Sequence, residues 1–367
     1  MRLLLLALFV ASAAAVELVP ILSVQESVPN RYMIKIKDGY TVADLLKRLP
    51  KQAELKRTYE AVFNGIAVEA PKDVIQRMRN VDIIEYIEED SIMRAACEWG
   101  CDRSNQRALP LDNNCNYYGN GAGARVYVAD TGIRHSHVEF GGRADYFWDF
   151  DPSNGGEDCH GHGTHCAGTA AGEDVGIANG ALVYSVRVLN CIGLGLTSNI
   201  VGGINAIAEG GTTPGIVSMS LGGGANQAMD DATRGVIAAG YPTAVAAGND
   251  NRDACLSSPA RVAEAETVGS TTSTDARSGF SNFGTCLDLF APGSNVRSAY
   301  HTSDTAYQTM SGTSMACPHV AGVMTLHVAS NRCSTGANCK TFLREESTKG
   351  AVSNPGTGSP NRLLYSD

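Results

Sequence analysis

The chain has little charge and no long run of one sign. Charged residues make up 18% of its 367 residues, and the formal net charge is -9 at pH 7. This dispersed acidic balance favours solubility and gives no support to nucleic acid as a partner. The 43% hydrophobic content is enough for a full core and an accessory domain. We therefore expect a soluble globular protein, and a monomer.

Long apolar runs are also missing after the first residues. Arg2 is followed by apolar residues 3–10 and then by small residues up to Ala15. The run is well short of the roughly 20 residues that a membrane-spanning helix needs, and its order is typical of a secretory signal peptide. We predict a signal peptide at residues 1–15 and a secreted, extracellular chain without a membrane anchor, which is the disfavoured alternative.

The 11 cysteines include no CxxC pair and no His/Cys cluster with the spacing of zinc ligands. In a secreted chain they indicate a disulfide framework, and their odd number leaves at least one thiol unpaired. Cys166 and Cys317 lie in apolar helical stretches, so we expect them to be free and buried. No Asn-x-Ser/Thr sequence occurs either, and N-glycosylation is not expected.

The chain changes character near residue 95. Residues 31–94 are charged and contain strand-like runs at 32–37 and 65–69 with helical patterns at 42–49 and 72–78, which predicts a small α+β unit. From residue 121, glycine-rich loops separate small-residue helices from apolar strands at 126–129, 181–188, 216–221 and 243–247. This alternation predicts an α/β domain with a mostly parallel sheet and helices on both faces.

Four polar residues lie at the ends of these elements. Asp130 follows the strand at 126–129, and Asn249 follows the strand at 243–247. His162 is bracketed by glycines before a small-residue helix, and Ser314 opens an apolar helix. Singly, each has an ordinary structural explanation as a turn, a loop residue, a core histidine or a helix cap. Because sites in open α/β sheets form beyond the carboxyl ends of the strands, their joint occurrence predicts that they converge.

Together these residues supply what a serine peptidase needs. Ser314 is the candidate nucleophile, His162 the base that takes its proton, and Asp130 the carboxylate that orients the imidazole. The main-chain amide of Ser314 and the side-chain amide of Asn249 are candidate donors to an oxyanion. A thiol nucleophile at Cys166 is the alternative, and it is disfavoured because the Ser314 hydroxyl is better placed.

At this point the chain resembles a known family, the subtilisin-like serine peptidases, and within it the proteinase K and aqualysin branch. The resemblance covers residues 97–365 and rests on the segments VADTGIRHSHVEFGGRA, GHGTHCAGTAAG, VSMSLGGG, VAAGNDN, SNFGTCLDLFAPG and GTSMACPHVAG. Upstream, RYMIKIKDG and YEAVFNGIAVEAP resemble the propeptide of that family, which assists folding and then inhibits.

The resemblance implies a subtilisin-like three-layer α/β fold with a mainly parallel central sheet, preceded by a small α+β ferredoxin-like propeptide. The implied domains are a signal peptide at 1–15, a propeptide at 16–95 with its inhibitor domain at about 31–94, and a peptidase domain at 96–367. The junction is expected between Met93 and Cys97. The implied activity is that of a secreted, self-processing serine endopeptidase with Asp130, His162 and Ser314 as triad and Asn249 in the oxyanion hole.

The resemblance also implies how partners bind. Polypeptide substrates, and the chain's own propeptide as chaperone and inhibitor, would occupy the site. A substrate would lie as an added strand between two segments, which implies broad specificity because main-chain pairing does not read sequence. Small residues around the side-chain pocket imply a preference for apolar or aromatic groups. The residues are Leu194, Gly195 and Leu196 on one edge, Ser220, Leu221 and Gly222 on the other, and Ala246 and Gly248 at the pocket.

Disulfides and calcium follow from the same resemblance. It implies the pairs Cys159–Cys191 and Cys255–Cys286, with Cys333–Cys339 closing a C-terminal loop. For the remaining cysteines, which are unusual for the family, we favour Cys101–Cys115 over a pair with Cys97. Calcium is the implied structural cofactor. One site would use Asp102, Asn105, Gln106, Asp112 and Asn114, weakened by Asn105 where relatives have Asp, and a second would use Asp288 with the carbonyls of Ala263 and Ala265.

Two further expectations concern this chain alone. His160 stands beside the cleft where relatives usually have Asn, and its titration is expected to influence substrate binding near neutrality. No acidic counterpart of another family calcium ligand occurs at residues 349–354. A catalytically dead binding protein is the competing function, disfavoured by the intact polar set, and a released propeptide acting separately as an inhibitor can coexist with a peptidase.

Overall fold

The computed structural model describes residues 18–24, 27–61, 63–91 and 97–367. The predicted signal peptide and residues 93–96 of the predicted propeptide junction lie outside the described residues. The chain divides into two compact units, Met1–Ala95 and Ala96–Asp367. Each unit has a hydrophobic core of its own. None of the helices in the described part is both long enough and apolar enough to cross a membrane.

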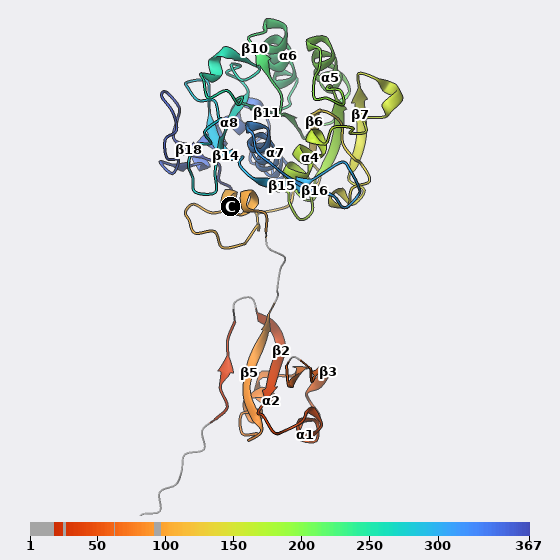
Figure 1. Ribbon diagram of the computed structural model, residues 1–367, viewed down its shortest axis with the longest axis vertical. Coiled ribbons are helices and arrows are strands. Elements are labelled where there is room, and N and C mark those ends of the chain that lie inside the picture. The colour runs from red at the N-terminus through yellow and green to blue at the C-terminus, as the bar shows by residue number, and fades with distance from the viewer. Residues whose placement is uncertain (1–17, 25–26, 62, 92–96) are drawn as a thin grey trace, which may run out of the picture. The chain divides into compact units, whose positions relative to one another are not determined.

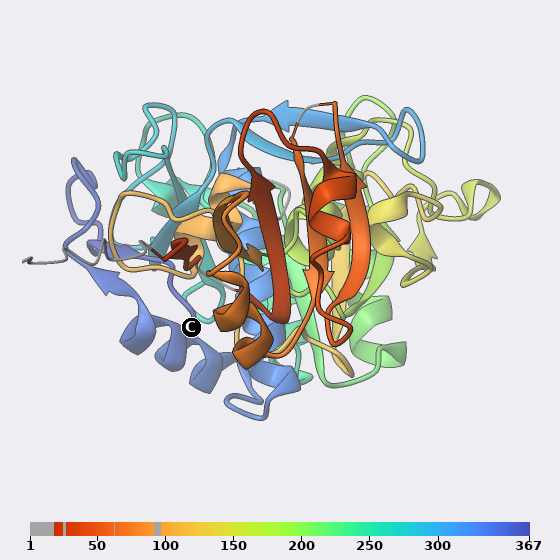
Figure 2. The same ribbon diagram turned by 90° about the horizontal axis from the view of Figure 1, so that it is seen from below.

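The first unit is a five-stranded sheet with two helices packed on its apolar face (Figures 1 and 2). Tyr32, Ile34 and Ile36 alternate inward along one strand, as expected of a half-buried sheet. The strand order β1-β5-β2-β4-β3 contains the ferredoxin-like pattern and confirms the predicted fold. The elements are β1 (Ile21–Leu22), β2 (Ser27–Ile36), α1 (Val42–Leu46), β3 (Glu54–Tyr59), β4 (Gly65–Glu69), α2 (Lys72–Met78) and β5 (Ile84–Ser91).

The second unit is built on a nine-stranded sheet of order β17-β18-β14-β13-β11-β9-β6-β8-β7. Every neighbouring pair is parallel except β17 with β18, which confirms the predicted mainly parallel sheet. The strands are β6 (Arg125–Asp130), β7 (Ala144–Asp149), β8 (Leu182–Arg187), β9 (Gly215–Met219), β11 (Thr243–Ala246), β13 (Glu266–Thr271), β14 (Leu289–Pro292), β17 (Thr348–Lys349) and β18 (Arg362–Leu363).

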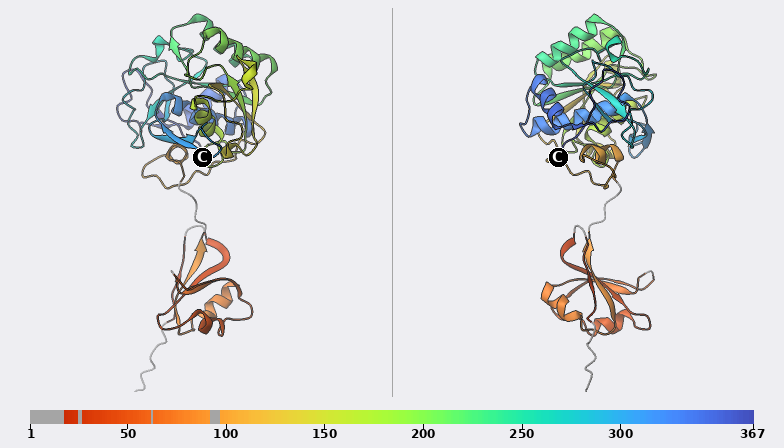
Figure 3. Two further views of the ribbon diagram at one scale, coloured as in Figure 1. Left: turned by 45° about the vertical axis from the view of Figure 1, so that its right-hand side comes forward. Right: turned by 90° about the vertical axis from the view of Figure 1, so that its left-hand side faces the viewer.

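Helices cover both faces of this sheet, which makes three layers (Figure 3). Val126 and Val128 of β6 pack toward α4 and α7, whereas Tyr127 and Ala129 pack toward α5 and α6. Because β6 is buried on both faces, its sequence is continuously apolar at residues 126–129 and does not alternate with polar residues. The helices are α3 (Trp99–Ser104), α4 (His162–Ala171), α5 (Thr197–Gly210), α6 (Gln227–Ala238), α7 (Thr313–Ala329) and α8 (Gly336–Glu346).

Smaller elements complete the unit. Two-stranded ribbons form from β10 (Gly223–Gly224) with β12 (Ser257–Ser258) and from β15 (Val296–Ala299) with β16 (Tyr307–Met310). Short 3-10 turns lie at Val138–Phe140, Pro152–Asn154 and Ala254–Leu256. From β6 the chain builds β7 and β8 on one side and then β9, β11, β13 and β14 on the other. The order therefore reverses at β6, the position at which open α/β sheets form their sites.

The structure contains four disulfides. Three are the pairs that the family resemblance implies, Cys159–Cys191, Cys255–Cys286 and Cys333–Cys339. The fourth is Cys97–Cys115, so the predicted pair Cys101–Cys115 is wrong. Helix α3 turns the Cys101 side chain inward, where its thiol contacts the carbonyl of Gly176 at 3.7 Å, and leaves Cys97 beside Cys115. Cys101, Cys166 and Cys317 are free and buried.

Candidate active site

Asp130 and His162 meet at the carboxyl end of β6. Asp130 is the last residue of that strand, and His162 is the first residue of α4. The His162 Nδ1 lies 2.7 Å from Asp130 Oδ1, which also accepts from the main-chain N–H of Thr131 at 2.7 Å. Because an ionised carboxylate can only accept, Nδ1 carries the proton of the neutral ring and Nε2 is left as its basic nitrogen. His162 lines an open pocket.

Burial and the neighbouring carboxylate shift the pKa of His162 in opposite directions. Burial of the imidazole lowers its pKa, since only 17% of the side chain is exposed. The charge of Asp130 and its hydrogen bond raise the pKa, and they outweigh burial, so the net pKa of His162 lies above its ordinary value. The carboxylate therefore both orients the ring and stabilises the imidazolium that forms when a proton is taken up.

Asp158 holds the loop that leads into α4, a role that the sequence did not suggest. Its carboxylate accepts five hydrogen bonds, from the side chains of Thr131 and Thr164 and from the main-chain N–H groups of His160, Gly161 and Thr164. Thr131 in turn accepts from Gly163 N at 2.9 Å. A Cβ at Gly163 would lie 2.2 Å from the carbonyl oxygen of Gly132, so only glycine permits this approach. The network fixes His162 against β6.

Ser314 lies in the first turn of α7, where the leading N–H groups of a helix have no partner within the helix. Its hydroxyl donates to the main-chain oxygen of Ser220 at 3.2 Å. Pro318, four residues later, has no N–H and cannot bond the Ser314 carbonyl as an ordinary helical residue would. That carbonyl instead accepts from the Ser220 hydroxyl at 2.9 Å and from the Cys166 thiol at 3.3 Å.

These contacts bring the two helix starts together. The Cys166 sulfur lies 3.3 Å from the Ser314 carbonyl and 3.9 Å from His162 Nδ1, so one side chain touches both. Burial raises the pKa of the Cys166 thiol and keeps it neutral, which makes it a poor nucleophile. Burial likewise raises the pKa of Cys317 to about 12. The buried thiols therefore serve packing, and Ser314 is the better candidate nucleophile.

The side chain of Asn249 is bound to the start of α7 through its oxygen, which leaves the amide nitrogen free among the described residues. Its Oδ1 accepts from the main-chain N–H of Thr313 at 2.8 Å and from the Thr313 hydroxyl at 3.0 Å. A Cβ at Gly312 would lie 3.5 Å from Ser314 N and 3.6 Å from Asn249 Nδ2, so both donors border one small space. Gly312 has no side chain to fill that space.

The residues predicted to form a side-chain pocket line one cavity. A pocket of about 310 Å³ is lined by Ala246, Gly248 and the segment 220–224, with Asn249 and Ser314 at its edge. The sequence did not indicate that Asp250 and Arg252 also line it. These two side chains form an ion pair of 3.2 Å and are about half exposed. Most of the lining residues are glycine, alanine or serine.

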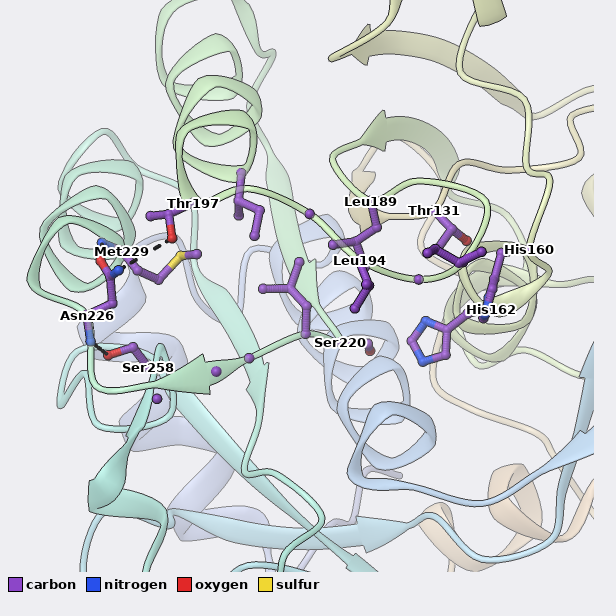
Figure 4. Close-up of a pocket in the computed structure, with 18 residues that line it drawn as sticks. Thr131, His160, His162, Leu189, Leu194, Thr197, Ser220, Asn226, Met229 and Ser258 are labelled. Carbon is purple, nitrogen blue, oxygen red and sulfur yellow. Dashed lines mark hydrogen bonds between the residues drawn. The ribbon is translucent and has the colours of Figure 1, made fainter.

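A second pocket, of about 520 Å³, is lined by His162 and Ser220 among other residues (Figure 4). Figure 4 shows Leu189, Leu194, His160 and His162 along one stretch of it, with Asn226, Met229, Thr197 and Ser258 at the far end. The His160 ring centroid is 6.3 Å from that of His162. His160 therefore borders the same cavity as the catalytic candidate and can influence what binds there.

Leu194, Gly195 and segment 220–222 of the two predicted edges line this pocket, whereas Leu196 does not. The main-chain groups of these edges are not all free. The N–H of Leu194 donates to Asn190 Oδ1, and its carbonyl accepts from Asn190 N at 2.9 Å. The carbonyl of Leu196 accepts from the first turn of α5. Among the described residues, Gly195 has neither group bonded, and the same holds for Leu221 and Gly222. Gly195 and segment 221–222 therefore have main-chain groups that are free to pair with an added strand.

The first predicted calcium site fits a cation. Asp102 Oδ1 and Asn105 Oδ1 are buried and have no hydrogen-bond partner among the described residues. Burial raises the pKa of Asp102, and the nearby charge of Asp112 raises it further. Gln106 Oε1 and Asn114 Oδ1 accept from main-chain N–H groups of the same loop. Unpartnered oxygens beside two close carboxylates are the donor set that Ca²⁺ prefers.

The second predicted calcium site is wrong. The ammonium of Lys340 occupies the position between its proposed ligands. It donates to the carbonyl of Ala263 at 2.8 Å, to the carbonyl of Ala265, and to Asp288 Oδ2 at 2.6 Å. A Ca²⁺ ion and an ammonium repel each other and cannot share these oxygens. Lysines in helices are usually solvated, so no sequence pattern indicates that this one is buried.

Comparisons with known proteins agree with this geometry. Residues 121–362 match the subtilase family, and residues 24–96 match the peptidase inhibitor I9 family. The chain is 43% identical to the extracellular serine proteinase of a Thermus species, strain Rt41A, over 96% of this chain and 94% of that protein. It is 37% identical to the cuticle-degrading protease of Metarhizium anisopliae over 92% of this chain and 90% of that protein.

A solved structure of a similar protein has the same fold. A cold-adapted subtilisin-like serine proteinase superposes with a TM-score of 0.72 at 47% identity. The superposition covers 74% of this chain and 99% of that one. The part of this chain that is matched corresponds in size to the second unit.

Proposed function

The chain belongs to the subtilase family of serine peptidases and carries an I9-type propeptide, and from that premise we propose how it acts. Ser314 attacks a peptide carbonyl, His162 accepts its proton at Nε2, and Asp130 orients and stabilises the imidazolium. The observation that carries this proposal is the 2.7 Å contact between His162 and the buried Asp130, beside the start of the helix that bears Ser314.

The first step requires a small rearrangement of the Ser314 side chain. Its hydroxyl donates to the Ser220 carbonyl, so it must turn toward His162 Nε2 before the proton can leave. The substrate strand is expected to pair beside segment 220–222 and so to compete with the Ser314 hydroxyl for the Ser220 carbonyl. Binding of a peptide and activation of the nucleophile would then be coupled.

The charge that develops on the carbonyl oxygen would be stabilised by the Ser314 main-chain N–H and the Asn249 side-chain amide. Thr313 holds the Asn249 oxygen, which leaves the nitrogen as the donor. After the C–N bond breaks, His162 returns the proton to the leaving amine, and an acyl group remains on Ser314. Water activated by the same imidazole then releases the acyl group and restores the hydroxyl.

Specificity would come from the two pockets and the unpaired main-chain groups. The small pocket walled by Ala246 and Gly248 favours an apolar or aromatic residue before the cleaved bond. The second pocket is lined by Leu189, Leu221, Ile200 and Met229 and favours further apolar residues. Main-chain pairing at Gly195 and Leu221 tolerates any sequence, so cleavage would be broad.

We also propose that the enzyme is secreted and releases its own propeptide, which would act as folding aid and inhibitor. Relatives are named as extracellular proteinases, and the I9 match covers residues 24–96. Calcium bound by the loop that contains Asp102, Asn105, Gln106, Asp112 and Asn114 would stabilise the second unit without taking part in chemistry.

The test of function compares secreted wild type with Ser314→Ala and with Ser311→Ala, a serine on the same loop outside the proposed triad. We expect wild type and Ser311→Ala to lose about the first 95 residues, the size of the first unit, and to cleave peptides after aromatic residues. Ser314→Ala should keep its propeptide and cleave nothing. Processing of Ser314→Ala would show that another protease matures the chain, and unprocessed, inactive wild type would support a dead homologue.

A further inference from the structure

Lys340 is a buried lysine whose three ammonium hydrogens all have acceptors. Its side chain is 10% exposed and comes from α8, while its acceptors lie before β13 and β14. Two are the carbonyls of Ala263 and Ala265, and the third is Asp288 Oδ2. An ammonium has three N–H donors and no acceptor, so this arrangement satisfies it completely.

Asp288 is the anion of this cluster. Its side chain is 7% exposed, and its two oxygens accept from Lys340, from Arg344 and from the main-chain N–H of Thr267 at 2.9 Å. Glu266 lies nearby with both carboxylate oxygens buried and unpartnered. Burial raises the pKa of Glu266 well above its ordinary value, and the charge of Asp288 raises it further. Two cationic side chains, those of Lys340 and Arg344, therefore bind the carboxylate of Asp288.

The positive charges of Lys340 and Arg344 at Asp288 disfavour binding of a divalent cation there. Two carbonyls and a carboxylate are the kind of oxygen ligands that hold Ca²⁺, but here they surround a positive charge that belongs to the chain. Any Ca²⁺ would have to displace Lys340 and remain beside Arg344. The ammonium is also covalently attached to α8, whose N-terminus is tied by the Cys333–Cys339 disulfide. Unlike a bound metal ion, this ammonium cannot be lost by dilution or removed by a chelator.

From this arrangement we infer that Lys340 is a built-in cation that replaces a structural metal ion at Asp288, Ala263 and Ala265. It joins α8 to the edges of β13 and β14 and makes this part of the protein independent of calcium. The oxygens remain arranged as a cation site, so removing the ammonium without filling its space should create one. This inference concerns stability and does not rest on the proposed peptidase mechanism.

The experiment compares melting temperatures of full-length chains that carry Ser314→Ala, so that self-digestion does not interfere. Each is measured in EDTA and in millimolar calcium. Lys340→Ala opens the site, Lys340→Met removes the charge but fills the space, and Lys349→Ala removes an exposed lysine as a control. In EDTA, the two Lys340 variants should melt on the order of 10 °C lower than the parent.

Calcium then separates the variants. It should raise the melting temperature of Lys340→Ala by several degrees more than that of the parent, because the vacated oxygens can bind the ion. Lys340→Met and Lys349→Ala should respond only as the parent does, through the loop that contains Asp112. A calcium response of Lys340→Ala no larger than the parent's would overturn the inference.

A second comparison keeps Lys340 and does not require a destabilised variant. Asp112→Asn weakens the first calcium site, so any remaining calcium response reports on other sites. We expect no remaining response that depends on Asp288. A response in Asp112→Asn that disappears in Asp112→Asn/Asp288→Asn would show that calcium binds at Asp288 despite Lys340, and the inference would be wrong.

Discussion

The helices α4 and α7 both begin at the proposed active site, but they are held there in different ways. The start of α4, which bears His162, is fastened by side chains: Asp158 accepts five hydrogen bonds, and Asp130 binds the imidazole. The start of α7, which bears Ser314, is fastened through the carbonyl that Pro318 leaves unbonded. The base thus depends on buried charge, whereas the helix start that bears the nucleophile is held by uncharged side chains, those of Ser220, Cys166 and Asn249.

The difference has a chemical reason. An imidazole must keep one tautomer and must be stabilised when it becomes charged, and only a fixed carboxylate does both. A serine hydroxyl must stay free to turn, and its neighbouring amide must stay unbonded to meet an oxyanion. Removing charge should therefore damage the α4 side most, whereas the α7 side should be sensitive to the loss of single donors.

The largest effect after loss of Ser314 itself is expected for Asp130→Asn on the α4 side. An amide cannot stabilise the imidazolium and favours the wrong tautomer, so kcat should fall about 10⁴-fold while the fold is kept. Steady-state cleavage of a peptide with an aromatic residue before the cleaved bond measures this. A loss below tenfold would mean that the 2.7 Å contact orients His162 without supporting catalysis.

On the α7 side, Asn249→Ala removes one proposed oxyanion donor. The expected loss is about 10²- to 10³-fold in kcat with little change in KM, because the donor acts mainly on the transition state. Asn251→Ala, at an exposed residue of the same loop, is the control. A rise in KM with unchanged kcat would instead assign Asn249 to substrate binding.

Stability should show the same asymmetry. Asp158→Asn removes the charge of a buried carboxylate and replaces one of its two accepting oxygens by an amide nitrogen, which cannot accept the hydrogen bonds made to that oxygen. It should lower the unfolding free energy by about 3 kcal/mol, or roughly 10 °C in melting temperature. Ser220→Ala removes one of the two hydrogen bonds that the Ser314 carbonyl accepts and leaves the one from the Cys166 thiol. It should lower the unfolding free energy by about 1 kcal/mol. Melting curves in the Ser314→Ala background compare the two, and equal losses would contradict the distinction.

The smallest expected effect is on the acid limb of the pH profile. His162 must be neutral to accept a proton, and its raised pKa places the loss of kcat/KM, as pH falls, above the ordinary value of about 6.5. In Asp130→Asn the attraction of the carboxylate is gone, so the residual activity should persist to lower pH. An acid limb at the same pH in both enzymes would show that another group controls it.

The neighbouring His160 is tested by the same profiles. We proposed that its titration influences substrate binding, since it lines the second pocket beside His162. His160→Asn should then change the pH dependence of KM and leave that of kcat as in wild type. Superimposable kcat/KM profiles of the two enzymes would remove His160 from the explanation.

Much of this architecture was predictable because its signals are local. The strand that ends at Asp130 is apolar on both faces, and the predicted 126–129 differs from β6 by one residue at each end. The helix that starts near Ser314 was also predicted, since glycine precedes it. The predicted strand 216–221 extends two residues beyond β9, because segment 220–221 is apolar yet stays outside the strand and borders the pocket.

The parts that the sequence did not reveal depend on partners far along the chain. Lys340 binds residues 52 to 77 positions away, and its place in a polar helix suggested a solvated side chain. Asp158 resembled an ordinary loop residue until the structure placed it beneath Thr131. The pairing of Cys97 with Cys115 is not predictable from spacing, because spacing does not tell which way a short helix turns its side chains.

The most direct test of the proposed catalytic centre is covalent labelling with a phosphonyl fluoride, followed by intact mass and peptide mapping. One adduct on Ser314 is expected in wild type, with much slower labelling in Asp130→Asn and none on Ser314→Ala. The same adduct rate in wild type and Asp130→Asn, or an adduct on any other residue, would contradict the assignment of Ser314 as a nucleophile activated by His162 and Asp130.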